Sequence, residues 1–242
     1  MSGQKKSAEQ GDAEAQYNFG LMHLQGVGTS INKEKAFKWY KKSAKQGNSI
    51  AQRELGFLYM EGIGTSIDKQ KAFEWTEKSA KQGDAEAQYN LGINYLFGNS
   101  VSINKKEAFK WILKSAEQGV DEAQYYIGGF YFEGIGTSIN KQKAFEWIKK
   151  SAEQGNRDAQ NQLGLMYIQG NGTIIDEQKA FGWTKKSAEQ GVVVAQFNLG
   201  VMYFEGIGVS TDKQKAIEWF EKSAKNGSQG AREALKVINL ND

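Results

Sequence analysis

The stretch EGIGTSIDKQKAFEW, residues 61–75, decides how this chain is interpreted. Its Gly-x-Gly-Thr-Ser run ahead of a lysine-rich segment is typical of a phosphate-binding loop, in which backbone N–H groups and a helix start attract an anion. The same pattern returns as EGIGTSINKQKAFEW at 133–147 and as EGIGVSTDKQKAIEW at 205–219. A ligand site is usually singular, whereas a joint between structural repeats occurs in every copy, so the recurrence favours a joint.

The period that carries these copies is constant. Glycine recurs every 36 residues, at Gly11, Gly47, Gly83, Gly119, Gly155, Gly191 and Gly227. A fixed period of this length predicts an array of stacked repeats. With positions numbered 1 to 36 from Asp12, the expected organisation is a single domain with a partial helix at 1–11, a C-terminal capping helix at 228–242, and six full repeats between them, at 12–47, 48–83, 84–119, 120–155, 156–191 and 192–227.

The first part of each repeat predicts a helix, called helix A here, over positions 2 to 14. Position 4 is Ala in all six repeats, position 8 is Phe, Leu or Ile, and position 12 is Tyr except at His23. Residues four apart share one face of an α-helix. Position 9 is always Gly, which costs about 1 kcal/mol relative to Ala inside a helix. We expect it to let a second helix approach closely at the Ala of position 25.

The second part of each repeat predicts a joint and a helix B over positions 22 to 35. Position 15 is always Gly, suited to the left-handed residue that ends a helix. Position 21 is always Asn or Asp, good helix N-caps. In the third repeat Ser100 replaces the second joint glycine, and Asn99 is expected to supply the positive φ. Position 28 carries the six tryptophans, which are expected to belong to the core: Trp39, Trp75, Trp111, Trp147, Trp183 and Trp219.

Composition excludes several classes of site. The chain has no cysteine and one histidine, His23, so no metal site is expected and His23 is interpreted as a partly buried stand-in for tyrosine. No catalytic residue, no cofactor and no enzymatic activity are expected. No apolar run reaches the roughly 18 residues of a membrane span, so membrane insertion is not expected. Segment 1–11 lacks a signal-peptide core, so the default expectation is a soluble, cytoplasmic protein, or a secreted or periplasmic one if a signal lies upstream.

These motifs resemble a known family. The pattern A-x-x-x-L-G-x-x-Y-x-x-G-x-G, followed by Asp or Asn, K-A, W and S-A-x-x-G, is similar to the Sel-one-like repeat, a relative of the tetratricopeptide repeat. The resemblance covers essentially the whole chain. It implies an all-α, right-handed solenoid of helix-turn-helix repeats that acts as a protein-interaction scaffold or adaptor. In the tetratricopeptide relatives the helix equivalent to helix A lines a concave groove.

Positions 3, 7, 10 and 14 of helix A lie well away from the packed stripe. If that groove carries over, the variable positions 3, 6, 7 and 14 are the candidate partner-binding positions. Aromatic side chains there would provide contact area, and Asn could pair with a peptide backbone. The candidate residues are Glu14, Tyr17, Asn18, Arg53, Glu54, Glu61, Glu86, Tyr89, Asn90, Phe97, Glu122, Tyr125, Tyr126, Glu133 and Asn198.

The charge distribution indicates what kind of partner would bind. The helix A segments sum to −9 and the joints with helix B to +11, although the whole chain carries only +3. An acidic groove predicts a protein or peptide partner with basic residues. A nucleic-acid partner is not expected, because the lysines are mixed with glutamates. The alternative function is a carbohydrate or cell-wall binding module that uses Tyr and Trp. Exposed indoles would favour this alternative and buried indoles the scaffold.

Overall fold

The structure is a computed structural model that describes residues 2–240. The described residues form fourteen α-helices and no strand, which confirms the predicted all-α repeat fold. They divide into two compact units, the N-terminal block (1–120) and the C-terminal block (121–242). The N-terminal block holds α1 (Ser2–Glu9), α2 (Ala13–Gln25), α3 (Lys33–Lys45), α4 (Ser49–Glu61), α5 (Lys69–Lys81), α6 (Ala85–Phe97) and α7 (Lys105–Glu117). The C-terminal block holds α8 (Asp121–Glu133), α9 (Lys141–Glu153), α10 (Arg157–Gln169), α11 (Glu177–Glu189), α12 (Val193–Glu205), α13 (Lys213–Lys225) and α14 (Gln229–Leu240).

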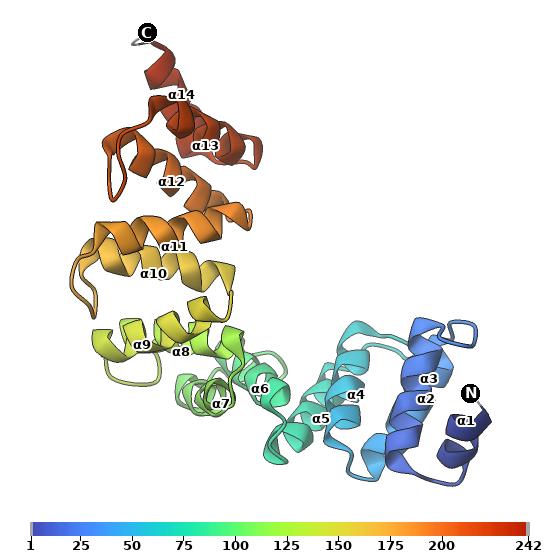
Figure 1. Ribbon diagram of the computed structural model, residues 1–242. Coiled ribbons are helices and arrows are strands. Elements are labelled where there is room, and N and C mark those ends of the chain that lie inside the picture. Colours follow the sequence, from blue (N-terminus) through green and yellow to red (C-terminus); the bar gives the residue numbers. More distant parts are fainter. Residues whose placement is uncertain (1, 241–242) are drawn as a thin grey trace. The chain divides into compact units, whose positions relative to one another are not determined.

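Inside each block the helices pack in chain order (Figure 1). Helix A of a repeat pairs with its own helix B, as α4 does with α5 and α10 with α11. Helix B then packs against helix A of the next repeat, as α5 does with α6 and α11 with α12. A lone hairpin would leave one apolar face open, and stacking the next hairpin covers that face. Residues 1, 241 and 242, at the ends of the two predicted terminal helices, lie outside the described residues.

The helix ends follow the predicted capping residues. At the start of each helix B, the residue of position 21 accepts a hydrogen bond from the backbone N–H three residues on. These caps are Asn32, Asp68, Asn104, Asn140, Asp176 and Asp212. Helix A ends at a left-handed glycine, for example Gly26 with φ 75° and Gly170 with φ 67°. Caps at position 1 of helix A, such as Asp12 and Asn48, were not predicted.

The glycine of position 9 lies where helices A and B approach each other. A Cβ built on Gly128 would lie 2.5 Å and 2.6 Å from two side-chain carbons of Ile148 and 3.2 Å from the Ala144 carbonyl oxygen. The predicted close approach is therefore present. The residue nearest to the glycine is the one at position 29, rather than the Ala side chain of position 25. Position 29 varies widely, and every member is buried: Tyr40, Thr76, Ile112, Ile148, Thr184 and Phe220.

A buried polar network joins consecutive repeats. In the second repeat the Gln52 amide donates to the Ala44 carbonyl of the preceding helix B and accepts a hydrogen bond from Gln82. Ser79 donates to the backbone carbonyl of Ser49, which ties helix B to the start of helix A. The network recurs in the C-terminal block, where Gln160 contacts Ala152 and Gln190. In the third repeat the equivalent serine, Ser115, is buried without a hydrogen-bond partner. Where the network is complete, it specifies how one repeat sits on the next.

The joint of the third repeat differs from the prediction. Ser100 itself adopts the left-handed conformation, with φ 66°, and Asn99 does not take it over. Ser100 lies at the place of the second joint glycine, which is Gly64 in the preceding repeat. The Ser100 hydroxyl is also buried without a hydrogen-bond partner. The repeat thus keeps the backbone geometry of glycine with a residue poorly suited to it.

Replacing Ser100 with glycine is therefore expected to raise the free energy of unfolding by about 1 kcal/mol, because glycine adopts a positive φ without strain. Urea denaturation followed by circular dichroism measures the change. The matched control is Ser102→Gly, two residues on and outside the positive-φ positions. The control is expected to be neutral or slightly destabilising. Equal shifts for the two variants would contradict strain at Ser100.

Candidate functional site

The fifteen predicted partner-binding residues lie away from the packed stripe of helix A. Some of their side chains are exposed and the others are half-buried. The stripe itself is confirmed, since positions 4 and 8 are buried in all six repeats. Seven of the predicted residues are exposed, namely Glu14, Glu61, Glu86, Asn90, Phe97, Glu122 and Glu133. The other eight are half-buried, namely Tyr17, Asn18, Arg53, Glu54, Tyr89, Tyr125, Tyr126 and Asn198.

In the N-terminal block, Arg53 is the centre of an ion-pair cluster. Its Nη1 lies 3.2 Å from each carboxylate oxygen of Asp84, and its Nη2 lies 3.1 Å from Glu54 Oε1. Asp84 also caps α6 by accepting a hydrogen bond from the Ala87 N–H at 2.8 Å. The guanidinium therefore links α4 to the start of α6. Since Arg53 and Glu54 are paired with each other, they contribute less free charge to this surface than their sequence positions indicated.

Two tyrosines adjoin this cluster. Tyr17 on α2 packs against Tyr40 on α3, with ring centroids 5.4 Å apart. Tyr40 is fully buried, and its hydroxyl has no hydrogen-bond partner. Burial raises the pKa of Tyr40 far above its usual range, and burial followed by the charge of Glu54 raises the pKa of Tyr17. Both side chains are therefore neutral, and only the half-buried Tyr17 is partly accessible to a partner.

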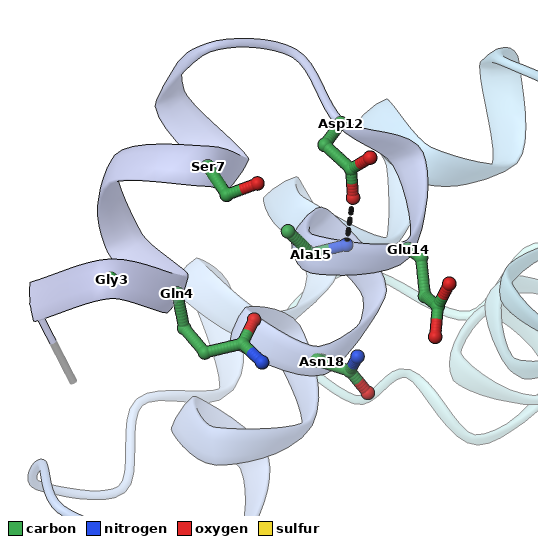
Figure 2. A pocket seen from close by; sticks show the side chains of 7 residues that line it. All are labelled: Gly3, Gln4, Ser7, Asp12, Glu14, Ala15 and Asn18. Atoms are coloured by element: carbon green, nitrogen blue, oxygen red, sulfur yellow. Dashed lines mark hydrogen bonds between the residues drawn. The ribbon is translucent and has the colours of Figure 1, made fainter.

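A shallow hollow of about 320 Å³ lies at the start of α2 (Figure 2). Gln4 and Ser7 line it from α1, and Glu14 and Asn18 line it from α2. Asp12 is held at its rim by the hydrogen bond that it accepts from the Ala15 N–H. The hollow thus brings two predicted residues, Glu14 and Asn18, together with two polar residues of α1 that the sequence reasoning did not identify.

In the C-terminal block, the predicted aromatic pair packs partly into the protein. Tyr125 and Tyr126 meet edge to face at 6.0 Å, and Tyr126 lies 6.5 Å from Phe130. Tyr125 contacts the buried cluster around Leu163, and burial raises its pKa, with a further contribution from Asp158. Another predicted tyrosine, Tyr89, belongs to α6 of the N-terminal block and is also half-buried.

The other predicted residues of the C-terminal block remain polar and accessible. Glu122 and Glu133 lie exposed near the two ends of α8. Asn198 on α12 donates a long hydrogen bond of 3.4 Å to Asn161 on α10, so position 7 of one repeat reaches position 6 of the preceding one. This contact places amide groups side by side on the helix A face of the block.

The tryptophans are half-buried rather than fully in the core, with the exception of Trp111, which is 9 % exposed. The lysine three residues later covers the ring of each, with Nζ 3.9–4.6 Å from the ring centroid. The predicted core role is thus correct in part, since Trp111 is buried and Trp39, Trp75, Trp183 and Trp219 pack against core clusters. Each indole also carries a cation–π contact.

The remaining chemistry is sparse. His23 is 6 % exposed and packs on Phe19, and burial followed by the charge of Lys35 lowers its pKa, so it is a neutral packed residue. Within residues 2–240 no group of three or more His, Cys, Asp or Glu side chains is arranged to hold a metal ion. In the same residues no helix is long and apolar enough to span a bilayer.

Sequence reasoning missed the buried glutamine of position 5, although a signal was present. Gln16, Gln52, Gln88, Gln124, Gln160 and Gln196 recur in every repeat. An amide side chain is ordinarily exposed. Its recurrence at one position of all six repeats indicated a structural hydrogen bond, which the structure supplies.

Comparison with known proteins identifies the repeat. The sequence model of the Sel1 repeat matches residues 13–48, 49–84, 85–120, 121–156, 157–192 and 193–228. These ranges begin one residue after the predicted repeats and together cover most of the chain. The comparison with curated proteins finds no significant match.

Several solved structures are similar to this one. A protective antigen of uropathogenic Escherichia coli strains, which displays an SLR fold, is 39% identical with a TM-score of 0.92. The alignment covers 98% of this chain and 51% of that one, so the chain spans about half the length of this relative. A Sel1 repeat protein from Oxalobacter formigenes is 32% identical with a TM-score of 0.79, over 91% of this chain and 88% of that one. A Klebsiella pneumoniae protein described as a sel1 repeat protein is 25% identical with a TM-score of 0.51, over 84% of this chain and 99% of that one.

Proposed function

This chain belongs to the Sel1 repeat family, and on that premise we propose that it is a non-enzymatic scaffold whose helix A face binds a partner protein or peptide. Proteins of this family are generally protein-interaction scaffolds and generally non-catalytic. The single observation that carries the proposal is the division of each helix A into a constant buried side and a variable exposed side. Repeats that share a fold and differ at one face can recognise a partner there without loss of stability.

The contrast between the two sides is visible at individual positions. Gln88 and Leu91 on α6 are buried, and Gln160 and Leu163 repeat them on α10. The exposed position 3 of the same helices carries Glu86 and Asp158, and in other repeats it is apolar, as at Ile50 and Val194. Such variation among copies of one fold is what a surface adapted to a specific partner requires.

The composition of this face supports a partner with basic residues. In the N-terminal block the exposed glutamates are Glu14, Glu61 and Glu86, and in the C-terminal block they are Glu122, Glu133 and Glu205. Exposed apolar side chains lie on the same helices, namely Ile50, Phe57 and Phe97 in the N-terminal block and Val194 and Phe204 in the C-terminal block. Acidic groups would speed association with a basic segment, and the apolar groups would provide contact area.

The indoles favour this function over carbohydrate binding. A sugar stacks on an open aromatic face, and here a lysine Nζ already lies over each tryptophan ring, for example 3.9 Å from the Trp219 centroid and 4.1 Å from that of Trp183. The opposite sides of these rings pack against the core clusters. Neither side of the Trp183 and Trp219 rings therefore offers a free platform.

The proposal predicts that charge reversal on helix A slows association with the natural partner. The partner is first captured on the full chain and identified by mass spectrometry, and its binding is then measured with both proteins purified. Two double variants report on one block each. The variant of the N-terminal block is Glu61→Lys with Glu86→Lys, and that of the C-terminal block is Glu122→Lys with Glu133→Lys. We expect at least one to lower the association rate constant about tenfold at low salt and to weaken its salt dependence.

The matched control reverses glutamates of helix B, Glu74→Lys with Glu146→Lys, which are exposed and change the net charge equally. This control is expected to leave the rate constant within about twofold, since its charges lie on the other helix of the hairpin. If neither helix A variant changes the association rate constant, or if the control lowers it as much as they do, the binding face lies elsewhere.

A further inference from the structure

A second surface, on α3, differs from every other helix B of the protein. Among its thirteen residues α3 has six lysines and a single acidic residue, Glu34. Each of the other five B helices has two glutamates and three or four lysines. The excess positive charge is therefore local to the first repeat, and the helix geometry shared by all repeats does not require it.

The lysines of α3 also lack acidic partners. On the other B helices lysines form ion pairs, as Lys71 does with Asp68 and Lys149 with Glu153. Among the described residues no carboxylate lies within ion-pair distance of the lysines of α3, namely Lys33, Lys35, Lys38, Lys41, Lys42 and Lys45. Uncompensated like charges on adjacent turns repel one another, which costs stability and favours an anionic ligand.

Five of these lysines, together with one indole, line a hollow of about 340 Å³. We call this surface the α3 lysine face, and it consists of Lys35, Lys38, Trp39, Lys41, Lys42 and Lys45. Trp39 is half-buried and packs edge to face on Phe19 at 5.3 Å. The Lys42 ammonium lies 4.2 Å from the centroid of its ring. The lysine stems form apolar walls, and the ammonium groups form a charged rim.

The spacing of the rim fits a segment that runs along the helix. Lys35, Lys38, Lys42 and Lys45 are separated by three, four and three residues, so they form one stripe. Three turns of helix make this stripe about 15 Å long. Trp39 lies beside the stripe, four residues after Lys35 and three before Lys42. A ligand with carboxylates along one edge and an apolar side chain in the middle would match both features.

The stripe is also narrow, which argues against an extended anionic ligand such as a bilayer or a long nucleic acid. One repeat further on, the positions of Lys38 and Lys41 are occupied by Glu74 and Glu77 of α5. One repeat earlier, the position of Lys45 is occupied by Glu9 of α1. A bilayer or a long nucleic acid would be brought against these carboxylates, whereas a short segment lying along α3 would avoid them.

We propose that the α3 lysine face binds a carboxylate-rich segment of a partner protein, with one apolar side chain of that segment against Trp39. This face lies on helix B, so it is distinct from the helix A face proposed above. The helix A face is proposed to bind a basic segment, whereas the α3 lysine face would bind an acidic one. The two faces would let the protein hold an acidic and a basic segment at the same time.

The test uses the full chain and a twelve-residue peptide of Glu and Asp with one central Phe, titrated at low salt. The first variant is Lys38→Glu, Lys41→Glu, Lys45→Glu. The protein itself carries Glu at these positions in other repeats, as Glu74, Glu77 and Glu153, so the helix is expected to tolerate the changes. We expect about tenfold weaker binding and a smaller salt dependence. Circular dichroism verifies that the variant is folded.

Two controls separate this surface from general attraction. The first is Lys110→Glu, Lys149→Glu, Lys185→Glu, which changes the net charge equally on other B helices, at the repeat positions of Lys38 and Lys41, and is expected to alter the affinity less than threefold. The second replaces the Phe of the peptide with Ala, which is expected to weaken binding several-fold only if the hollow is filled. Failure of the peptide to bind, or equal losses for the two lysine variants, would overturn the proposal. Tighter binding of phosphatidylserine vesicles or of a single-stranded oligonucleotide, lost in the first variant, would also overturn it.

Discussion

Replacing Gly128 with leucine is expected to lower the free energy of unfolding by about 3 kcal/mol or more. The helix A backbone at this position lies against helix B so closely that even a Cβ would overlap Ile148 and press on the Ala144 carbonyl. Ile148 is 2 % exposed, so other side chains enclose it. The helices α8 and α9 would have to separate, and the separation would open the contacts on both sides of the hairpin.

The neighbouring residue provides the control. Gly129 lies on the same helix, and nothing lies within 4 Å of a Cβ built on it. Gly129→Leu is expected to be neutral or to stabilise the protein by up to about 1 kcal/mol, because leucine favours the helix more than glycine does. Urea denaturation of both variants gives the comparison. Coincident unfolding curves would show that close approach does not explain the glycine of position 9.

Replacing Gly64 with alanine is expected to have the second-largest effect, a loss of about 3 kcal/mol, for a different reason. Gly64 has φ +69°, and a Cβ there would overlap the carbonyl group of Lys33 at the start of the preceding helix B. Two costs add, the strain of a left-handed alanine and the contact with a backbone that cannot rotate away.

The matched variant Gly83→Ala separates these two costs. Gly83 has φ +99°, and a Cβ there would meet nothing within 4 Å. Its substitution is therefore expected to show only the conformational strain, about 1 kcal/mol. The difference between the two variants in thermal or urea denaturation measures the contact between the joint and the preceding repeat. If Gly83→Ala costs as much as Gly64→Ala, that contact contributes nothing.

The glycines of the GIGTS run thus have a structural role that a phosphate site would not need. In the second repeat Gly62 ends α4 in the left-handed region, Gly64 touches the preceding repeat, and Asp68 caps α5. The same arrangement recurs in the fifth repeat with Gly170, Gly172 and Asp176. The recurrence that argued for a joint in the sequence is matched by the same backbone contacts in both blocks.

The helices themselves could be predicted because their signals are local. Gly26 and Asn32 mark the end of one helix and the start of the next by backbone conformation and side-chain capping, which depend on only a few neighbouring residues. The angular position of a residue on its helix is local as well. For this reason Glu14, Glu86 and Glu122 could be placed on the exposed side, and Leu55 and Leu163 in the core.

Which side chains meet across helices depended on the tertiary structure. Helical periodicity gives the direction of a side chain but not the axial offset between two packed helices, so Gly128 was expected to face Ala144 and instead meets Ile148 first. For the same reason the sequence did not show that Arg53 reaches Asp84, a residue 31 positions away. It also did not show that Tyr125 leans into the core. Within this protein the 36-residue sequence period determined the helices and their exposed sides. The offset and close approach of neighbouring helices decided which predicted site residues are paired with one another and which remain accessible to a partner.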